Sequence, residues 1–111
     1  SPDFQKLYDQ LVFKGSKSRV EAFKVGALIE DLDIKDLMDY LDEVTNENII
    51  MVFENLAKGS RNHLRAFNRH LVRLGVTYTP EYISQDEFDK IISSPHEAGN
   101  IYYRGRGVSK N

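Results

Sequence analysis

Residues 47–75 read ENIIMVFENLAKGSRNHLRAFNRHLVRLG, and apolar side chains recur in this stretch every three or four residues. That period predicts one long amphipathic α-helix. Thr45 or Asn46 is expected to cap its N-terminus, and Gly75 is expected to end it. The apolar stripe comprises Ile49, Phe53, Leu56, Ser60, His63, Phe67, Leu71 and Leu74. Two of its members, Ser60 and His63, are polar, so the middle of the predicted buried stripe is a candidate functional site.

A second long helix is predicted just before this one. Ser18 and Glu21 match a capping box, and a 3.6-residue apolar period continues through about Glu43. Its apolar positions include Ala22, Phe23, Gly26, Ile29, Leu37, Leu41 and Val44. Two helices of about 27 residues with a short connection predict an antiparallel hairpin about 40 Å long.

Short helices are predicted on both sides of the hairpin. Residues 2–14 show helical spacing that stops at Gly15 and Ser16, and Ser84 with Glu87 forms a capping box for a helix to about Ser93. Residues 95–111 have no periodicity. We therefore expect an all-α domain over residues 1–94, with no strands, followed by an extended or disordered tail over residues 95–111.

The composition excludes several classes of protein. The chain has no cysteine, which rules out disulfides and thiolate metal sites, so any metal needs His, Asp or Glu ligands. The run Ile49–Phe53 is too short to span a bilayer, and no signal peptide is visible, so we expect a cytoplasmic protein without membrane contact. The chain begins SPDF without an initiator methionine, which suggests a trimmed or partial protein.

Two long amphipathic helices cannot bury both of their stripes against two short ones. Something else must cover the remainder, either a second copy of this chain in a dimer or a missing N-terminal segment. A four-helix bundle is the usual solution.

The predicted hairpin brings acidic and imidazole side chains to one level. Glu30 and His63 fall at the same height of an antiparallel hairpin that turns near Asn46, and Asp33 lies one turn away, near Gly59 and Ser60. A buried His–Glu pair is often a polar contact that fixes helix register. A metal site needs three or four ligands, and this chain offers Glu30, His63 and Asp33.

Arginines recur every four residues in the second long helix, at Arg61, Arg65, Arg69 and Arg73. The simplest interpretation is ion pairing with the carboxylates of the facing helix, together with solvation. A nucleic-acid groove is the alternative, to which the tail YYRGRG would contribute, but the nearby acids make nucleic acid an unlikely partner. No Ser-His-Asp or phosphate-loop spacing supports hydrolysis or nucleotide cleavage.

Three blocks, VGALIEDLDIKDL, ENLAKGSRNHLRAF and YTPEYISQDEFDKII, together resemble an uncharacterised ferritin-like domain family of archaea and bacteria, classed as a domain of unknown function. The resemblance covers residues 4–92. It implies that the chain is the second helix pair of a four-helix bundle and that the first pair, with an acidic motif and a Glu-x-x-His, is absent.

The resemblance also implies site residues. Glu30 would supply the carboxylate of the third bundle helix and His63 the imidazole of the fourth, while Ser60 stands where a bridging glutamate is expected. We expect Glu30 and His63 as metal ligands and Asp33 as a further ligand or hydrogen-bond acceptor, with iron or another divalent metal as cofactor. The alternative is a metal-free oligomerisation module in which the Glu30–His63 pair is structural. No catalytic residue or reaction is assigned.

Overall fold

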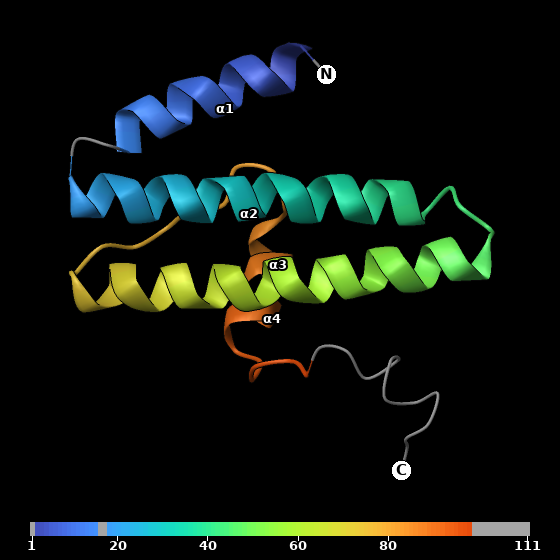
Figure 1. The fold of residues 1–111 in the computed structure, drawn as a ribbon. Helices are drawn as coiled ribbons and strands as arrows, with labels where there is room; N and C mark the ends of the chain where they lie inside the picture. Colours follow the sequence, from blue (N-terminus) through green and yellow to red (C-terminus); the bar gives the residue numbers. More distant parts are fainter. Residues whose placement is uncertain (1, 16–17, 99–111) are drawn as a thin grey trace.

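The computed structural model describes residues 2–15 and 18–98 of the 111-residue chain. These residues form four α-helices and no strand: α1 (Pro2–Gly15), α2 (Arg19–Leu41), α3 (Glu47–Arg73) and α4 (Gln85–Ile92). The long helices α2 and α3 lie side by side and antiparallel, α1 lies along the other side of α2, and α4 contacts α3 (Figure 1). The all-α prediction is therefore confirmed for the described residues.

The helix boundaries follow local capping chemistry. The side-chain oxygens of Ser18, Asn46 and Ser84 each accept hydrogen bonds from backbone N–H groups two or three residues further on, at 2.9–3.1 Å. These bonds satisfy donors that the first turn of a helix otherwise leaves unpaired. The N-caps predicted from the sequence are thus confirmed at all three helices. None of the helices in the described ranges has the length and hydropathy needed to cross a membrane.

The end of α3 turns the chain back over the hairpin. Gly75 has a φ of 76°, a left-handed conformation that glycine adopts without a steric penalty. The N–H of Gly75 donates to the carbonyl of Val72, and the N–H of Val76 donates to that of Leu71, both at 2.9 Å. This is a Schellman motif. It directs the following segment, residues 76–84, across the side of the hairpin that faces away from the viewer in Figure 1.

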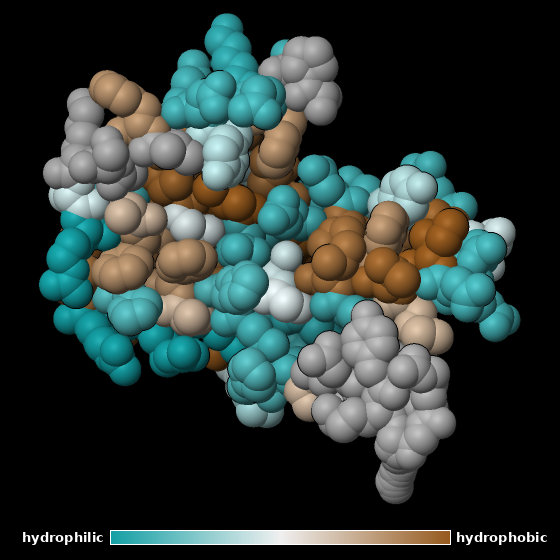
Figure 2. All heavy atoms as spheres, viewed as in Figure 1, coloured by the Kyte–Doolittle hydropathy of each residue, from teal (hydrophilic) through white to brown (hydrophobic). Residues whose placement is uncertain are grey.

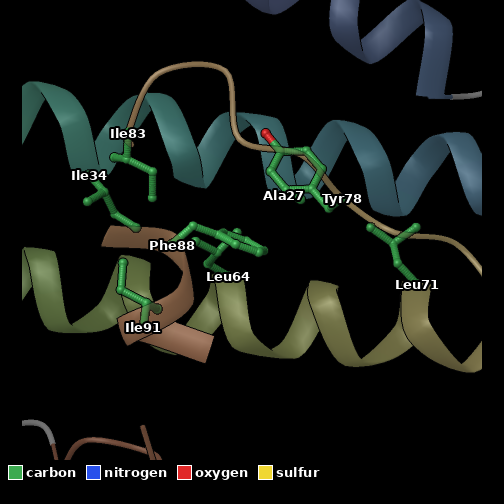
Figure 3. Packing of buried hydrophobic residues seen from close by; sticks show 8 residues of the cluster. All are labelled: Ala27, Ile34, Leu64, Leu71, Tyr78, Ile83, Phe88 and Ile91. Atoms are coloured by element: carbon green, nitrogen blue, oxygen red, sulfur yellow. The ribbon is translucent and has the colours of Figure 1, made fainter. Parts of the chain in front are cut away.

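We call residues 76–84 the crossing segment. The hydrophobic core lies between this segment and one face of the hairpin, and we call that face the covered face. Side chains of α2, α3, α4 and the crossing segment meet there (Figure 3). The buried members are Ala27, Ile34, Leu64, Leu71, Tyr78, Ile83, Phe88 and Ile91. The covered face therefore has its own apolar partner within this chain.

A buried carboxylate fixes the path of the crossing segment. Asp31 is 0% exposed and accepts four hydrogen bonds. One comes from the Tyr78 hydroxyl at 2.6 Å, and three come from the backbone N–H groups of residues 81–83 at 2.7–3.1 Å. Burial of a carboxylate is costly unless such donors surround it. The contact also raises the pKa of Tyr78, whose phenol is desolvated and bonded to the Asp31 carboxylate.

A second polar cluster holds the chain after α4. The Glu97 carboxylate accepts from Arg61 Nε and Nη2 at 2.7 and 2.6 Å and from Arg65 Nη2 at 2.6 Å. Asn62 exchanges two hydrogen bonds of 2.9 Å with the backbone of Glu97. Residues 95–98 thus lie against α3 without helical structure, and the rest of the predicted tail, residues 99–111, lies outside the described residues.

Candidate functional site

The opposite side of the hairpin, which we call the open face, is built from matched levels of α2 and α3. At each level one residue of α2 meets one of α3 through a ring contact, an ion pair, close packing or a shared pocket. The six levels, in order, are Phe23 with His70, Gly26 with Phe67, Glu30 with His63, Asp33 with Ser60, Leu37 with Leu56, and Tyr40 with Phe53. Of these residues, Phe23 and Phe67 are half-buried and also pack against the core of the covered face. This is the register that the sequence predicts for a hairpin turning near Asn46.

Glu30 and His63 meet near the middle of this face. His63 Nδ1 lies 3.4 Å from Glu30 Oε2, so the predicted juxtaposition is confirmed. The two side chains differ in exposure, at 67% for His63 and 14% for Glu30. The expectation that His63 is buried is therefore wrong for this chain, because nothing in the described residues covers its side of α3.

The carboxylates of the site occupy a partly desolvated setting. Burial raises the pKa of Glu30 above its ordinary value, and the nearby charge of Asp33 adds to this rise, against the opposing effects of His63 and Ser60. Burial also raises the pKa of Asp33, with a further contribution from the charge of Asp36. Desolvation without a full set of donors leaves both carboxylates in a setting where a nearby positive charge would be stabilising.

Small residues bring the helices close at this level. A Cβ at Gly26 would lie 2.5 Å from the Phe67 ring, so glycine is required for the observed packing. Ser60, 9% exposed, lines a pocket of about 300 Å³ with Asp33, Asp36, Leu37 and Leu56. Its lining combines acidic and apolar side chains: α2 contributes two aspartates and a leucine, and α3 contributes a leucine and the serine.

Apolar side chains flank the polar centre and remain exposed. Figure 2 shows them gathered over the turn end of α2 and α3, with hydrophilic atoms nearer the middle of the hairpin. Leu56 is 52% exposed, Ile49 40% and Leu74 41%, although the sequence places all three on a buried stripe. That stripe belongs largely to the open face, whereas Leu64 and Ala57, outside the predicted stripe, are buried.

The site supplies part of a metal-ligand set. Glu30 offers a carboxylate oxygen and His63 an imidazole nitrogen within reach of one ion, and Asp33 lies one turn along α2. Across residues 2–15 and 18–98, no group of three or more His, Cys, Asp or Glu side chains is arranged to hold a metal. The donors therefore fit a metal site chemically, but those in the described part of the chain are too few to complete one.

Among the four arginines that recur along α3, which we call the arginine ridge, two have a different role from the one predicted. Arg61 and Arg65 pair with Glu97 and not with the carboxylates of α2, so the expected interhelical pairing is wrong for these two. Arg65 is 6% exposed and also donates to the carbonyl of Ile91 at 2.8 Å. Arg61 and Arg65 thus hold the segment that follows α4. The YYRGRG sequence, which the alternative nucleic-acid surface would include, lies outside the described residues.

A relative of this chain has a similar sequence and a similar fold. An uncharacterized protein of Methanocaldococcus jannaschii, MJ0754, is 57% identical over 99 residues, which cover 89% of this chain and 54% of that protein. The crystal structure of the hypothetical protein MJ0754 superposes with a TM-score of 0.83 and covers 87% of this chain and 55% of the other. The chain thus spans about half the length of that relative.

Residues 1–95 match the family described as an uncharacterized protein domain, DUF2202. This match includes α1 to α4 and every residue of the open face. The chain therefore belongs to the DUF2202 family of uncharacterized domains.

Proposed function

We propose that this chain forms half of a ferritin-like four-helix bundle that binds a divalent metal ion through Glu30 and His63. The observation that carries the proposal is the 3.4 Å contact of a mostly buried carboxylate with an imidazole on an uncovered helical face. In helical bundles, metal ligands project from facing helices into the core between them. Glu30 and His63 come from two such helices and point to the side that still needs a partner.

The ligand types narrow the class of metal. Carboxylate and imidazole donors suit iron, zinc, manganese or cobalt, and the chain has no thiolate to offer. Bound iron would supply redox chemistry with dioxygen or peroxide by analogy with other ferritin-like bundles. The residues of this chain would hold the ion, and Asp33 would accept a hydrogen bond from a ligand or add a carboxylate of its own.

The number of ligands requires a second helix pair. Glu30 and His63 are two donors, whereas a closed site takes about four. The apolar residues at both ends of the open face are suited to bury a facing pair of helices, which would bring further donors to the level of Glu30. Ser60, in place of a bridging glutamate, favours a single ion over a two-metal centre.

Metal binding is best tested by equilibrium dialysis of the purified chain against Co²⁺ and, without oxygen, Fe²⁺. We expect Glu30→Gln and His63→Ala each to weaken binding about tenfold or more, as loss of a metal ligand does. His96→Ala and Glu54→Gln are matched controls, because both side chains are exposed and lie away from the open face. Binding that is absent in the unmodified chain, or unchanged in His63→Ala, would contradict the proposal.

A second candidate function is an interaction module without metal. It is favoured by the exposure of Leu56 and Val52, both 52%, because apolar patches of this kind mark protein contacts. In that case the Glu30–His63 pair fixes the helix register only. Thermal stability that depends on protein concentration but not on added metal would distinguish this function from the first.

A further inference from the structure

We propose that the outer side of α3, which faces away from α2, is a binding site for an extended acidic peptide segment anchored by a glutamate. The chain's own residues 95–98 occupy this site, with Glu97 as the anchor; Figure 1 shows this part of the chain below α3. The support comes from the contacts made to Glu97, from the way the fold holds the side chains that make them, and from the weak attachment of the occupying segment. The proposal involves neither Glu30 nor His63, so it goes beyond the proposed metal site.

Two arginines bind the side chain of Glu97. Nε and Nη2 of Arg61 donate to its two carboxylate oxygens at 2.7 and 2.6 Å, and Nη2 of Arg65 donates to one of them at 2.6 Å. Paired N–H donors of a guanidinium match the two oxygens of a carboxylate, so this contact selects a carboxylate over an amide or a hydroxyl. The arginines also lower the pKa of Glu97 to about 2, which shows how strongly they favour its charged form.

Asn62 binds the backbone of the same residue. Its Nδ2 donates to the Glu97 carbonyl at 2.9 Å, and its Oδ1 accepts from the Glu97 N–H at 2.9 Å. Every residue except proline offers this donor and this acceptor, so the contact recognises a backbone and no particular side chain. Backbone hydrogen bonds combined with a contact for one side chain are a recurring mode of binding extended peptides. The contacts therefore specify an extended segment with a glutamate at one position.

The fold holds the receptor side chains by bonds that do not involve Glu97. Arg65 is 6% exposed, its Nε donates to the carbonyl of Ile91 at 2.8 Å, and its Nη1 donates to Asn62 Oδ1 at 2.7 Å. These bonds join the end of α4 to α3 and fix the orientation of the guanidinium. A buried cation without an anionic partner is costly. The site is therefore expected to bind another carboxylate whenever Glu97 leaves it.

The occupying segment is attached to the domain mainly through Glu97. The side chains of Pro95, His96 and Ala98 are exposed, and no member of the hydrophobic core comes from residues 93–98. Segments with few buried apolar contacts open at a much lower free energy than the core does. Residues 95–98 are therefore expected to detach while the helices remain folded, which lets a second segment compete for the site.

A cavity of about 400 Å³ adjoins the bound carboxylate and favours an acidic partner. Its lining includes the cations Arg61, Arg65 and Lys90 and the carboxylates Glu87 and Glu97. When Glu97 leaves, three cations remain with one carboxylate, so a negatively charged segment is attracted more than a neutral or basic one.

The first experiment measures by NMR titration how the full chain binds the peptide acetyl-SPHEA-amide, which has the sequence of residues 94–98. We expect Glu97→Ala to bind it roughly tenfold more tightly than the unmodified chain does, because the tethered Glu97 competes at millimolar effective concentration. The same peptide with glutamine in place of its glutamate should bind Glu97→Ala roughly tenfold more weakly. Equal binding of the two peptides, or no binding to Glu97→Ala at about 10 mM peptide, would overturn the proposal.

A substitution in the receptor locates the bound peptide. In the Glu97→Ala background, Arg61→Ala should weaken peptide binding roughly tenfold, because the paired donors to the carboxylate are lost. Arg69→Ala is the matched control, since Arg69 is an exposed arginine of the same ridge and does not line the cavity. Equal losses in the two variants would place the peptide elsewhere and overturn the proposal.

Amide hydrogen exchange tests the detachment in the unmodified chain. The N–H of Glu97, which donates to Asn62, should have a protection factor roughly a hundredfold lower than that of Leu64 in the core. Added acetyl-SPHEA-amide should lower the protection of Glu97 further, because it competes for Asn62 and the two arginines. Equal protection of Glu97 and Leu64 would overturn the proposal, since the segment would then detach only when the whole domain unfolds.

Discussion

The two faces of the α2–α3 hairpin differ in what covers them. On the covered face, Leu64 is 0% exposed beneath the crossing segment, and Asp31 has four hydrogen-bond donors. On the open face, Leu56 is 52% exposed, and the polar partners of Glu30 among the described residues are the His63 imidazole and the Ser60 hydroxyl. Both faces combine apolar side chains with a carboxylate, but only one is complete. The covered face therefore stabilises the chain, and the open face is where binding is expected.

Removal of the buried carboxylate should have the largest effect on stability. Asp31→Ala would leave the Tyr78 hydroxyl and three backbone N–H groups without their acceptor, and each unpaired buried group costs about 1–3 kcal/mol. We expect a loss of about 4 kcal/mol in the free energy of unfolding, measured by urea denaturation. Asp33→Ala on the open face is the control and should cost less than about 1 kcal/mol. Equal losses would remove the distinction between the two carboxylates.

Substitution of one leucine of α3 on each face compares directly how much the two faces contribute to stability. Leu64→Ala should cost about 3 kcal/mol, because it opens a cavity in the core, whereas Leu56→Ala should cost less than about 1 kcal/mol in the monomer. Chemical denaturation at low protein concentration and in the presence of chelator measures both. If Leu56→Ala proved as costly as Leu64→Ala in the monomer, the open face would not be open in solution.

The Glu97 cluster gives the covered side a pH dependence. Arg61 and Arg65 lower the pKa of Glu97 from 4.5 to about 2. A carboxylate with a lowered pKa contributes stability above the unfolded value, and that stability is lost as the pH falls from about 4.5 towards 2. Glu97→Gln should therefore cost about 2 kcal/mol at pH 7, and the difference from the unmodified chain should shrink below pH 4.5. Glu43→Gln, at an exposed position in the turn, is the control, and a difference independent of pH would contradict the ion pair.

The smallest expected effect is a gain in stability from a substitution at Gly59 of α3. A Cβ at Gly59 would have no atom within 4 Å, and the residue lies inside a helix. Gly59→Ala should raise the free energy of unfolding of the monomer by about 1 kcal/mol through helix propensity. Gly26→Ala is the contrasting variant, because its Cβ would meet Phe67 at 2.5 Å. A gain of the same size at Gly26 would show that Phe67 moves aside freely.

Much of the hairpin could be predicted from the sequence, because the residues that determine its helices and its turn lie close together along the chain. Periodicity gives the helices, capping residues give their ends, and the turn near Asn46 sets the register that brings Glu30 to His63. Which face of the hairpin is covered and which is exposed could not be predicted in this way. Asp31 follows a helical spacing between the buried Ala27 and Ile34, which is a signal that it lies on the covered face, but its partners are about 50 residues away along the chain. Nothing in the sequence around Glu97 indicates that this residue pairs with Arg61 and Arg65.

Native mass spectrometry of the unmodified chain and of His63→Ala, before and after chelation, tests the central claim most directly. The account predicts a species that carries a discrete metal mass, loses that mass on chelation, and is metal-free in His63→Ala. Unmodified protein without metal after incubation with Fe²⁺ or Co²⁺, or His63→Ala with its metal retained, would contradict a site at Glu30 and His63.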